Sequence, residues 1–378
     1  MTLGVIEMST VEEMIEACTG CGSCTDVCPF YKVTGNEMYG AMAKVDAARA
    51  LHGGEALSEE SLKTLLLCTR CDRCIAECPV DVSVPDIVQN ARAEMRRRGL
   101  LPQKSSSIAK AIVESGSPMA APPQDRLGYL PPDFRPPERA EYLYVPGCWS
   151  SIRLPETARA SLQLLNRSGM DVTVLGERER CCGLFLIDNG MMDEARKIAE
   201  DNTLLFESTS AKVVIAECPA CFDVFKNVYP ALFREPDYKV LYIGEVLKDL
   251  IDLGRIKVRN SEQKVIFKDP CPLVRRHDMI ETPRKVLGSV AELVEYKEHG
   301  REAACCGAPA GVKPLYPEIA NKLAETLMDE ASSKGVTEVG VGCAFCMYHM
   351  KGALRGPEDP RTIRTLSQLV LANIEDGT

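Results

Sequence analysis

Hydrophobic residues recur with helical spacing through the first hundred positions. Val11, Met14 and Ile15 fall on one face of a helix, and helices are also expected over 37–52, 58–67 and 84–98. Apolar positions three and four residues apart form a stripe that a helix can bury against its neighbours. Residues 1–100 are therefore predicted to form an all-helical domain.

The stretch over 101–140 differs in composition from the residues before it. It is rich in proline, serine and glycine, most densely from Ser115 to Ala140, and it has no apolar period. Such a composition is typical of an extended connection rather than of a packed unit. We predict a linker or wrapping arm here, and with it a domain boundary.

From residue 141 onward, short apolar runs alternate with helical segments. Strands are predicted over 141–148, 171–175, 211–218, 264–271, 291–296 and 338–343, and helices over 155–168, 191–207, 283–290 and 315–331. Alternating strands and helices predict a parallel α/β sheet, one in residues 141–260 and one in 261–378. The predicted fold class is multidomain α plus α/β.

Composition and charge narrow the possible functions. The chain has 378 residues, 45% of them hydrophobic, and a net charge of −9. A nucleic-acid partner needs a basic face, so we expect none. We find neither a signal peptide nor an apolar run of about 18 residues, so we expect a cytoplasmic chain that could lie on the inner face of the membrane through a partner. Thiols there stay reduced and available to metals.

Eighteen cysteines dominate the candidate chemistry. The first eight form two copies of C-x2-C-x2-C-x3-C-P, fifty residues apart: Cys18, Cys21, Cys24 and Cys28, then Cys68, Cys71, Cys74 and Cys78. In such pairs the fourth cysteine of each copy binds the cluster of the other copy. One [4Fe-4S] cubane is therefore assigned to Cys18, Cys21, Cys24 and Cys78, and a second to Cys68, Cys71, Cys74 and Cys28. Paired zinc sites are the alternative, but this is not a zinc spacing.

The other ten cysteines also form two copies. They are Cys148, Cys181, Cys182, Cys218 and Cys221, then Cys271, Cys305, Cys306, Cys343 and Cys346. The offset between the copies is 123 to 125 residues, and each adjacent pair is followed by a glycine, Gly183 or Gly307. Such an internal duplication predicts a pseudo-two-fold arrangement with two metal sites facing each other. Four of the ten cysteines follow predicted strands, where ligands of parallel sheets bind.

Five cysteines exceed what an ordinary cubane requires. A cubane takes four thiolates, so five ligands would need an opened or distorted cluster. The alternatives are a disulfide between the adjacent cysteines, or four ligands with one bystander. The same surplus in both copies disfavours the bystander.

The complete pattern resembles a known family. C-x32-CCG-x34-C-x2-C followed by C-x33-CCG-x35-C-x2-C is similar to the CCG-domain signature of the B and D subunits of heterodisulfide reductase from methanogenic archaea. The N-terminal part resembles the helical ferredoxin domain of succinate dehydrogenase iron–sulfur subunits. The fusion of the two resembles the D subunit. The resemblance implies two duplicated α/β CCG domains, each holding a noncubane [4Fe-4S] cluster through all five cysteines, in addition to the two cubanes.

The resemblance also implies an activity. The family reductively cleaves the disulfide between coenzyme M and coenzyme B, with electrons entering through the ferredoxin clusters. No G-x-G-x-x-G fingerprint is present, so the electron donor would be a partner: a membrane cytochrome b, or a soluble flavin or hydrogenase complex. The alternative is an electron-transfer subunit of a quinone-linked glycerol-3-phosphate, glycolate or lactate dehydrogenase. Those relatives often have incomplete CCG motifs, so two complete motifs favour the reductase. A metal-stabilised scaffold would not explain the paired redox spacing.

Four further residues are candidates for substrate contacts. Both coenzymes are anionic, and Arg153, Arg275 and Arg276 follow the first cysteine of each copy closely. His277 could donate a proton to a leaving thiolate. Many relatives have D-P-C-H at the second copy, whereas this chain has Pro272 in the last position, so that histidine has no counterpart here.

Overall fold

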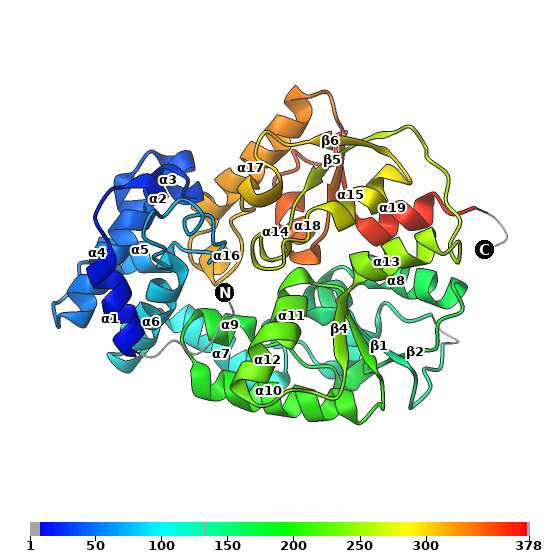
Figure 1. Ribbon diagram of the computed structural model, residues 1–378, viewed down its shortest axis with the longest axis horizontal. Coiled ribbons are helices and arrows are strands. Elements are labelled where there is room, and N and C mark those ends of the chain that lie inside the picture. Colours follow the sequence, from blue (N-terminus) through cyan, green and yellow to red (C-terminus); the bar gives the residue numbers. More distant parts are fainter. Residues whose placement is uncertain (1–7, 132–133, 376–378) are drawn as a thin grey trace.

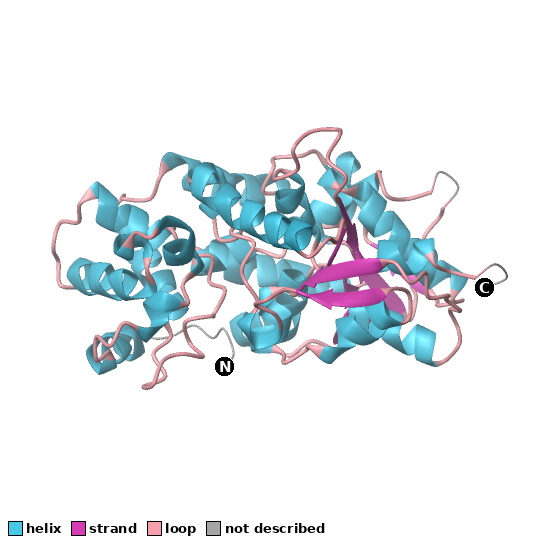
Figure 2. Cartoon of the chain, turned by 90° about the horizontal axis from the view of Figure 1, so that it is seen from above, coloured by secondary structure: helices cyan, strands magenta, loops and turns pink. Residues whose placement is uncertain are grey.

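Three regions follow one another along the chain. The computed structural model describes residues 8–131 and 134–375. The helical N-terminal region lies at one end, and the two α/β halves lie beside each other at the other end (Figure 1). Seen from above, all strands lie within the α/β end (Figure 2). The predicted fold class is confirmed.

The N-terminal region consists of helices joined by cysteine-bearing loops. They are α1 Met8–Ala17, α2 Ser23–Asp26, α3 Pro29–Thr34, the 3-10 helix η1 Glu37–Tyr39, α4 Ala41–His52, α5 Glu59–Leu66 and α6 Val84–Arg97. The four helices expected from the periodicity are all present. Fully buried Arg92 of α6 donates hydrogen bonds to the carbonyls of Leu65, Leu66 and Cys68 at 3.1, 3.1 and 2.7 Å. It thereby satisfies carbonyls at the end of α5 and fixes the start of the second cysteine loop.

Part of the predicted linker is helical. Residues Gln103–Ser115 form α7, and Pro123–Leu127 form the 3-10 turn η2. The prediction of an extended segment over 101–140 was therefore wrong for α7. Ala109 and Ile112 are buried on one face of α7, and Ile108 packs beside them. This short apolar stripe is hard to separate by composition from the proline-rich residues that follow it.

Each half contains a four-stranded parallel sheet. The first comprises β1 Tyr142–Val145, β2 Val172–Val174, β3 Val213–Ala216 and β4 Lys239–Tyr242, in the order β2-β1-β3-β4. The second comprises β5 Lys264–Lys268, β6 Glu292–Glu295, β7 Glu338–Val341 and β8 Thr362–Thr365, in the order β6-β5-β7-β8. The sequence did not predict β4 and β8. Both are four-residue edge strands that run directly into a helix, α13 Ile243–Asp252 or α19 Leu366–Ala372, so no turn signal separates the strand from the helix.

Helices flank both sheets. In the first half they are α8 Pro155–Arg167, α9 Leu184–Asp188, α10 Met192–Glu207, α11 Pro219–Asp223, α12 Tyr229–Leu232 and α13 Ile243–Asp252. In the second they are α14 Cys271–Arg276, α15 Glu281–Gly288, α16 Val312–Leu315, α17 Pro317–Ser333, α18 Ala344–Lys351 and α19 Leu366–Ala372. Short π-helical segments, η3 Trp149–Arg153 and η5 Val224–Val228, occur in the first half. The remaining 3-10 turns are η4 Gly176–Arg178 and η6 Gly300–Glu302.

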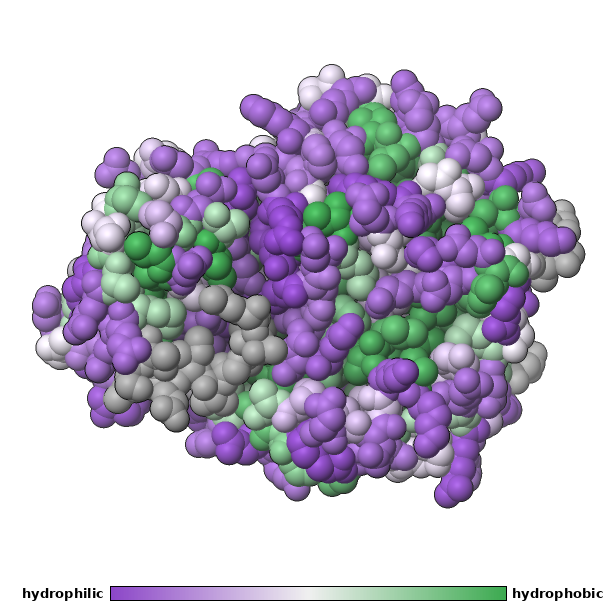
Figure 3. All heavy atoms as spheres, viewed as in Figure 1, coloured by the Kyte–Doolittle hydropathy of each residue, from purple (hydrophilic) through white to green (hydrophobic). Residues whose placement is uncertain are grey.

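The two halves pack reciprocally. Helix α8 of the first half contacts α19 of the second, and α13 of the first contacts α15 of the second. Helices α8 and α15 follow the first strand of their halves, whereas α13 and α19 follow the last strand. In each contact, therefore, the helix after the first strand of one half packs against the helix after the last strand of the other. The Ser161 and Ser367 hydroxyls lie 2.7 Å apart across this seam, and the Tyr242 hydroxyl donates to the Gly342 carbonyl at 2.7 Å. The viewed face is mostly hydrophilic, with hydrophobic residues gathered in several separate patches (Figure 3).

Candidate metal centres

Four cysteines line a pocket near the surface of the helical region. Cys18, Cys21, Cys24 and Cys78 surround it together with Met42 and the side chains of several valines. We call it the outer ferredoxin pocket, because Cys21 is exposed to solvent. Its lining contains no lysine or arginine among the described residues. Burial, reinforced by the neighbouring Cys18 thiol, raises the pKa of Cys24 to about 11.

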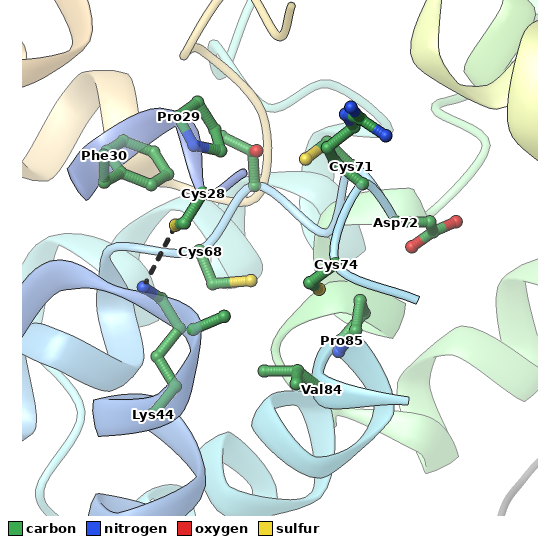
Figure 4. Close-up of a pocket in the computed structure, with 13 residues that line it drawn as sticks. Cys28, Pro29, Phe30, Lys44, Cys68, Cys71, Asp72, Cys74, Val84 and Pro85 are labelled. Atoms are coloured by element: carbon green, nitrogen blue, oxygen red, sulfur yellow. Dashed lines mark hydrogen bonds between the residues drawn. The ribbon is translucent and has the colours of Figure 1, made fainter. Parts of the chain in front are cut away.

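A second set of four cysteines lines a deeper pocket. Cys28, Cys68, Cys71 and Cys74 lie around a common space, with Pro29 and Phe30 on one side and Val84 and Pro85 on another (Figure 4). We call it the inner ferredoxin pocket. Each pocket combines three cysteines of one copy with the fourth of the other, which is the grouping assigned from the spacing. Val84 lines both pockets and so lies between them.

The five cysteines of the first half form a continuous series of thiols, which we call the first five-cysteine site. In order they are Cys148, Cys181, Cys182, Cys221 and Cys218, each in contact with the next. Cys148 follows β1 and Cys218 follows β3. These adjacent strands lead into connections that run in opposite directions, and the crevice at such a switch point is where parallel sheets bind ligands.

The second half repeats this arrangement in the second five-cysteine site. Its thiols follow in the order Cys271, Cys305, Cys306, Cys346 and Cys343. The N–H of Gly307 lies 3.4 Å from Cys305 Sγ, and the N–H of Gly183 lies 3.4 Å from Cys181 Sγ. Both glycines have positive φ, 93° and 80°, which explains why glycine follows each adjacent pair.

The sites form a single series through the molecule. The Cys71 thiol of the inner ferredoxin pocket contacts Cys305, and the Thr69 hydroxyl lies 3.3 Å from Cys305 Sγ. At the far end of the second site, Cys343 contacts Cys218 of the first. Electrons entering at the outer ferredoxin pocket would therefore meet the inner pocket, the second five-cysteine site and the first five-cysteine site in that order.

Three buried cations face the cysteines, and the sequence reasoning missed all of them. Lys44 Nζ lies 3.8 Å from Cys28 Sγ, Lys268 Nζ lies 3.8 Å from Cys271 Sγ, and Arg126 Nη2 lies 3.4 Å from Cys148 Sγ. Their exposed fractions are 1%, 2% and 2%. The sequence could have indicated Lys268 as a residue beside the metal site, because it ends an apolar strand three residues before a cysteine. No sequence feature pointed to Arg126, because it lies in the segment predicted to be a linker.

These cations test whether the sites suit iron–sulfur clusters. A buried ammonium group is costly unless negative charge compensates it. Neither Lys44 nor Lys268 pairs with a carboxylate anywhere in the described parts of the chain, and both face thiols. An anionic thiolate-bound cluster would supply the missing charge, so the residues fit the group. Within residues 8–131 and 134–375, no three His, Cys, Asp or Glu side chains form a site for one metal ion.

Comparison with known proteins identifies the family. The model of the cysteine-rich CCG domain matches residues 142–226 and 265–351, and that of the 4Fe-4S dicluster domain matches 14–82. The chain is 30% identical over 365 residues to the D subunit of dihydromethanophenazine:CoB–CoM heterodisulfide reductase from Methanosarcina acetivorans, covering 89% of this chain and 88% of the relative. The chain belongs to the family of heterodisulfide reductase D subunits. As a member of this family, it is an iron–sulfur oxidoreductase with 4Fe-4S domains.

Other relatives have different names. The B subunit of fumarate reductase (CoM/CoB) from Methanothermobacter marburgensis is 29% identical, covering 96% of this chain and 73% of the relative. "Probable iron-sulfur-binding oxidoreductase FadF" of Bacillus subtilis is 24% identical, covering 92% and 58%. A glutamate racemase from Bacillus anthracis has a TM-score of 0.31 and 11% identity over 62% of this chain and 79% of that structure, which is too remote to bear on fold or function. Among the described helices of this heterodisulfide reductase family member, none is long and apolar enough to span a bilayer.

Three of the four candidate substrate residues have protein partners. Arg275 donates to the carbonyls of Cys71 and Arg301 at 2.8 and 2.9 Å, and to that of Ala303. Arg276 pairs with Asp72 at 2.5 Å and with Asp223 at 2.7 Å. Both arginines therefore join the helical region to the α/β halves.

The other two candidates differ from each other. His277 Nε2 lies 2.9 Å from Asp223 Oδ1, and its ring packs on Phe222 with centroids 4.6 Å apart. Arg153 is exposed and makes no hydrogen bond or ion pair with any residue that the structure describes. Only Arg153 of the four is thus available to an external anion.

Proposed function

We propose that this chain reductively cleaves a small disulfide, the heterodisulfide of coenzyme M and coenzyme B, between its two five-cysteine sites. The observation that carries the proposal is the contact between Cys218 and Cys343, which joins two complete sites end to end. A disulfide bound across this junction has one sulfur toward each site. The relatives from Methanosarcina that are named as CoB–CoM heterodisulfide reductase subunits support this choice of substrate.

The proposed cofactors are two cubane and two noncubane [4Fe-4S] clusters. Cubanes are assigned to the outer and inner ferredoxin pockets, and noncubane clusters to the two five-cysteine sites, with all ten of their cysteines as ligands. Iron–sulfur clusters, when bound, supply one-electron redox chemistry. The protein residues hold them in sequence, exclude water and set the local charge.

The reaction consumes two electrons and two protons. The S–S bond of the substrate breaks, and each sulfur gains one electron and one proton to become a thiol. Cleavage develops negative charge on both sulfurs. Lys268 and Arg126 lie buried beside Cys271 and Cys148, at the end of each five-cysteine site that is remote from the Cys218–Cys343 junction. At that end they stabilise negative charge taken up by the sites rather than contact the substrate, Lys268 more than Arg126, which pairs with Glu179.

Electrons enter from a partner at the exposed end of the series. The outer ferredoxin pocket is the site closest to solvent, because Cys21 is exposed. We propose a membrane cytochrome b or a soluble flavin or hydrogenase complex as donor, with the chain in the cytoplasm or bound through that partner to the inner face of the membrane. Subunit names among the relatives favour a multi-subunit complex.

The substrate anion is assigned to the side of the junction that carries Arg153. Trp149, four residues before Arg153, stacks on Phe345 with ring centroids 4.3 Å apart and packs at a tilt against Tyr348 with centroids 4.6 Å apart. Trp149 follows Cys148 directly, and Phe345 lies between Cys343 and Cys346. Partly exposed aromatic and cationic groups thus adjoin both sites, which suits a thiol with an anionic tail.

The test is EPR spectroscopy on anaerobically purified protein oxidised with and without coenzyme M or coenzyme B thiol. We expect a paramagnetic signal that appears only with thiol and disappears in C218S or C343S. The variant R153M should weaken thiol binding without changing iron content. Spectra unchanged by either thiol would contradict the proposal.

The alternative proposal is an electron-transfer subunit of a quinone-linked dehydrogenase for glycerol 3-phosphate, glycolate or lactate. The similarity to the Bacillus subtilis oxidoreductase favours this alternative, because the alignment with that protein covers 92% of this chain. This alternative predicts reduction of all clusters by a flavin dehydrogenase partner and no response to thiols.

A further inference from the structure

The two five-cysteine sites differ in the charges that face them. Lys268, the last residue of β5, extends its Nζ to within 3.8 Å of Cys271 Sγ and donates to the Asp269 carbonyl at 2.6 Å. Arg275 faces the same site, and the structure places its guanidinium against backbone carbonyls. In the described parts of the chain, neither cation pairs with a carboxylate. The nearby Asp269 carboxylate instead pairs with Arg284 at 2.9 Å.

The first site has a compensated cation. Arg126 Nη2 lies 3.4 Å from Cys148 Sγ, but Arg126 Nη1 pairs with Glu179 at 2.9 Å. Both side chains are almost completely buried, at 3% and 1% exposed. A second carboxyl group, that of Glu217, is buried next to Cys218. The net positive charge beside the first site is therefore small.

The duplication makes this difference informative. Cys148 corresponds to Cys271, so the position of Lys268 corresponds to Val145 in the first half. The first half has no lysine at its own equivalent position and receives Arg126 from the segment between the domains. The two sites share their cysteine ligands but not the source or the balance of their charge.

We propose that Lys268 and Arg275 give the second five-cysteine site a higher reduction potential than the first, whose cation Arg126 is neutralised by Glu179. Reduction adds negative charge, and a buried, uncompensated cation stabilises the reduced form. The second site is also the one that contacts Cys71 of the inner ferredoxin pocket. The electron that leaves that pocket is therefore stabilised at the five-cysteine site it reaches first, and the second site is the electron-accepting member of the pair.

The experiment is a reductive titration of the cluster-loaded full chain with dithionite, followed by EPR at pH 8. Signals are assigned in two backgrounds, C182A/C221A without the first site and C306A/C346A without the second. The variant K268M removes the charge and K268R retains it. The matched variant R126M/E179Q removes both members of the neutral pair at the first site.

We expect K268M to lower the ratio of reduced to oxidised second site about tenfold at a fixed potential, which is about 59 mV for one electron. K268R should keep the reduction potential of the second site close to the wild-type value. R126M/E179Q should leave the reduction potential of the first site nearly unchanged. Loss of second-site iron in K268M but not in K268R would also support the proposal, because charge rather than packing would then hold the anion.

Three results would overturn it. The first is an unchanged reduction potential of the second site in K268M at full iron content. The second is a shift in potential of equal size in K268M and in R126M/E179Q. The third is an equal loss of second-site iron in K268M and K268R. The titration needs no disulfide, so it is independent of the proposed substrate. If thiols cause no EPR change, the proposed function fails while this inference stands or falls on the potentials alone.

Discussion

The two α/β halves share a strand order and a cysteine pattern, yet equivalent positions serve different purposes. Arg153 and Arg276 both lie five residues after the first cysteine of their half. Arg153 is exposed, whereas Arg276 is mostly buried between Asp72 of the helical region and Asp223 of the first half. The two halves thus share their cysteine pattern, whereas the residues around the cysteines differ where the second half contacts the helical region.

The difference indicates a division of labour. The second half contacts the helical region through Cys305, Arg275 and Arg276, and it faces the inner ferredoxin pocket. The first half lies at the far end of the series and has buried carboxyl groups beside its cysteines. One half is suited to receive electrons, and the other completes the junction at which we place the substrate.

Removing one adjacent cysteine pair should have the largest effect. The variants C305A/C306A and C181A/C182A should each lose the iron of one cluster, measured per chain by elemental analysis. Only C305A/C306A should also abolish reduction of the other five-cysteine site by a donor acting at the outer ferredoxin pocket, because the second site lies between them. Equal reduction kinetics in the two variants would contradict the order of the sites.

Breaking the Arg276 ion pairs should destabilise the junction of the three regions. We expect R276M to cost about 3–5 kcal/mol in the free energy of unfolding, because Asp72 and Asp223 would lose the guanidinium that compensates their charge, and Asp223 would keep only the contact with His277 and a hydrogen bond from Asn227. The matched variant R153M should change it by less than about 0.5 kcal/mol. Anaerobic chemical denaturation of the loaded protein measures both. Similar costs would show that the equivalent arginines do not differ in structural role.

A pH dependence should belong to the first half. Burial raises the pKa of Glu217 to about 7, even though Ser161 and Tyr144 donate hydrogen bonds to it at 2.6 and 2.9 Å. Its folded pKa lies above the unfolded value, so its contribution to stability is full below about pH 4.5 and is lost as the pH rises to about 7. The loss is of the order of 3 kcal/mol.

The variant E217Q tests this assignment. It should remove about half of the slope of unfolding free energy against pH between about 4.5 and 7, because glutamine does not ionise, whereas Glu179, whose pKa burial also raises to about 7, keeps its own contribution. Gly342 occupies the equivalent position of the second half, so no matching contribution arises there. An unchanged slope in E217Q would assign the pH dependence to another group.

The glycines after the adjacent cysteines should show the smallest difference. A Cβ at Gly307 would lie 2.7 Å from Leu323 Cδ1 and 3.0 Å from the Ala320 carbonyl oxygen, whereas one at Gly183 would lie 3.3 Å from Ile198 Cγ2. Both have positive φ, so alanine costs about 1 kcal/mol at either position. Overpacking should make G307A worse than G183A by about 1–2 kcal/mol in anaerobic unfolding. The reverse order would mean that the second half relaxes more easily.

Much of the fold could be predicted, because its signals are local. The apolar runs predicted β1, β2, β3, β5, β6 and β7, and helical periodicity predicted α1, α4, α5 and α6 but not the short helices α2 and α3. Edge strands β4 and β8 were missed because each runs directly into a helix, α13 or α19, with no turn residues to mark the end of the strand. Helix α7 was missed because a three-residue buried stripe stands next to a proline-rich segment.

The candidate substrate residues show where local reasoning stops. Arginines close to a cysteine in sequence suggested anion binding, but Arg275 and Arg276 bind groups of the helical region some two hundred residues away. Arg126 lies 22 residues from Cys148 along the chain, yet its guanidinium reaches that thiol. Side chains of this length reach across domain boundaries, so their partners depend on how the regions pack.

The amino-acid sequence by itself determined the grouping of the cysteines, the duplication and the alternation of strands and helices, because spacing and periodicity are properties of short stretches of chain. Only the tertiary structure decided the order of the sites, the contact of Cys71 with Cys305 and of Cys218 with Cys343, and the distribution of buried charge. Those features depend on through-space distances between distant segments. Coulomb interactions act over such distances regardless of sequence separation.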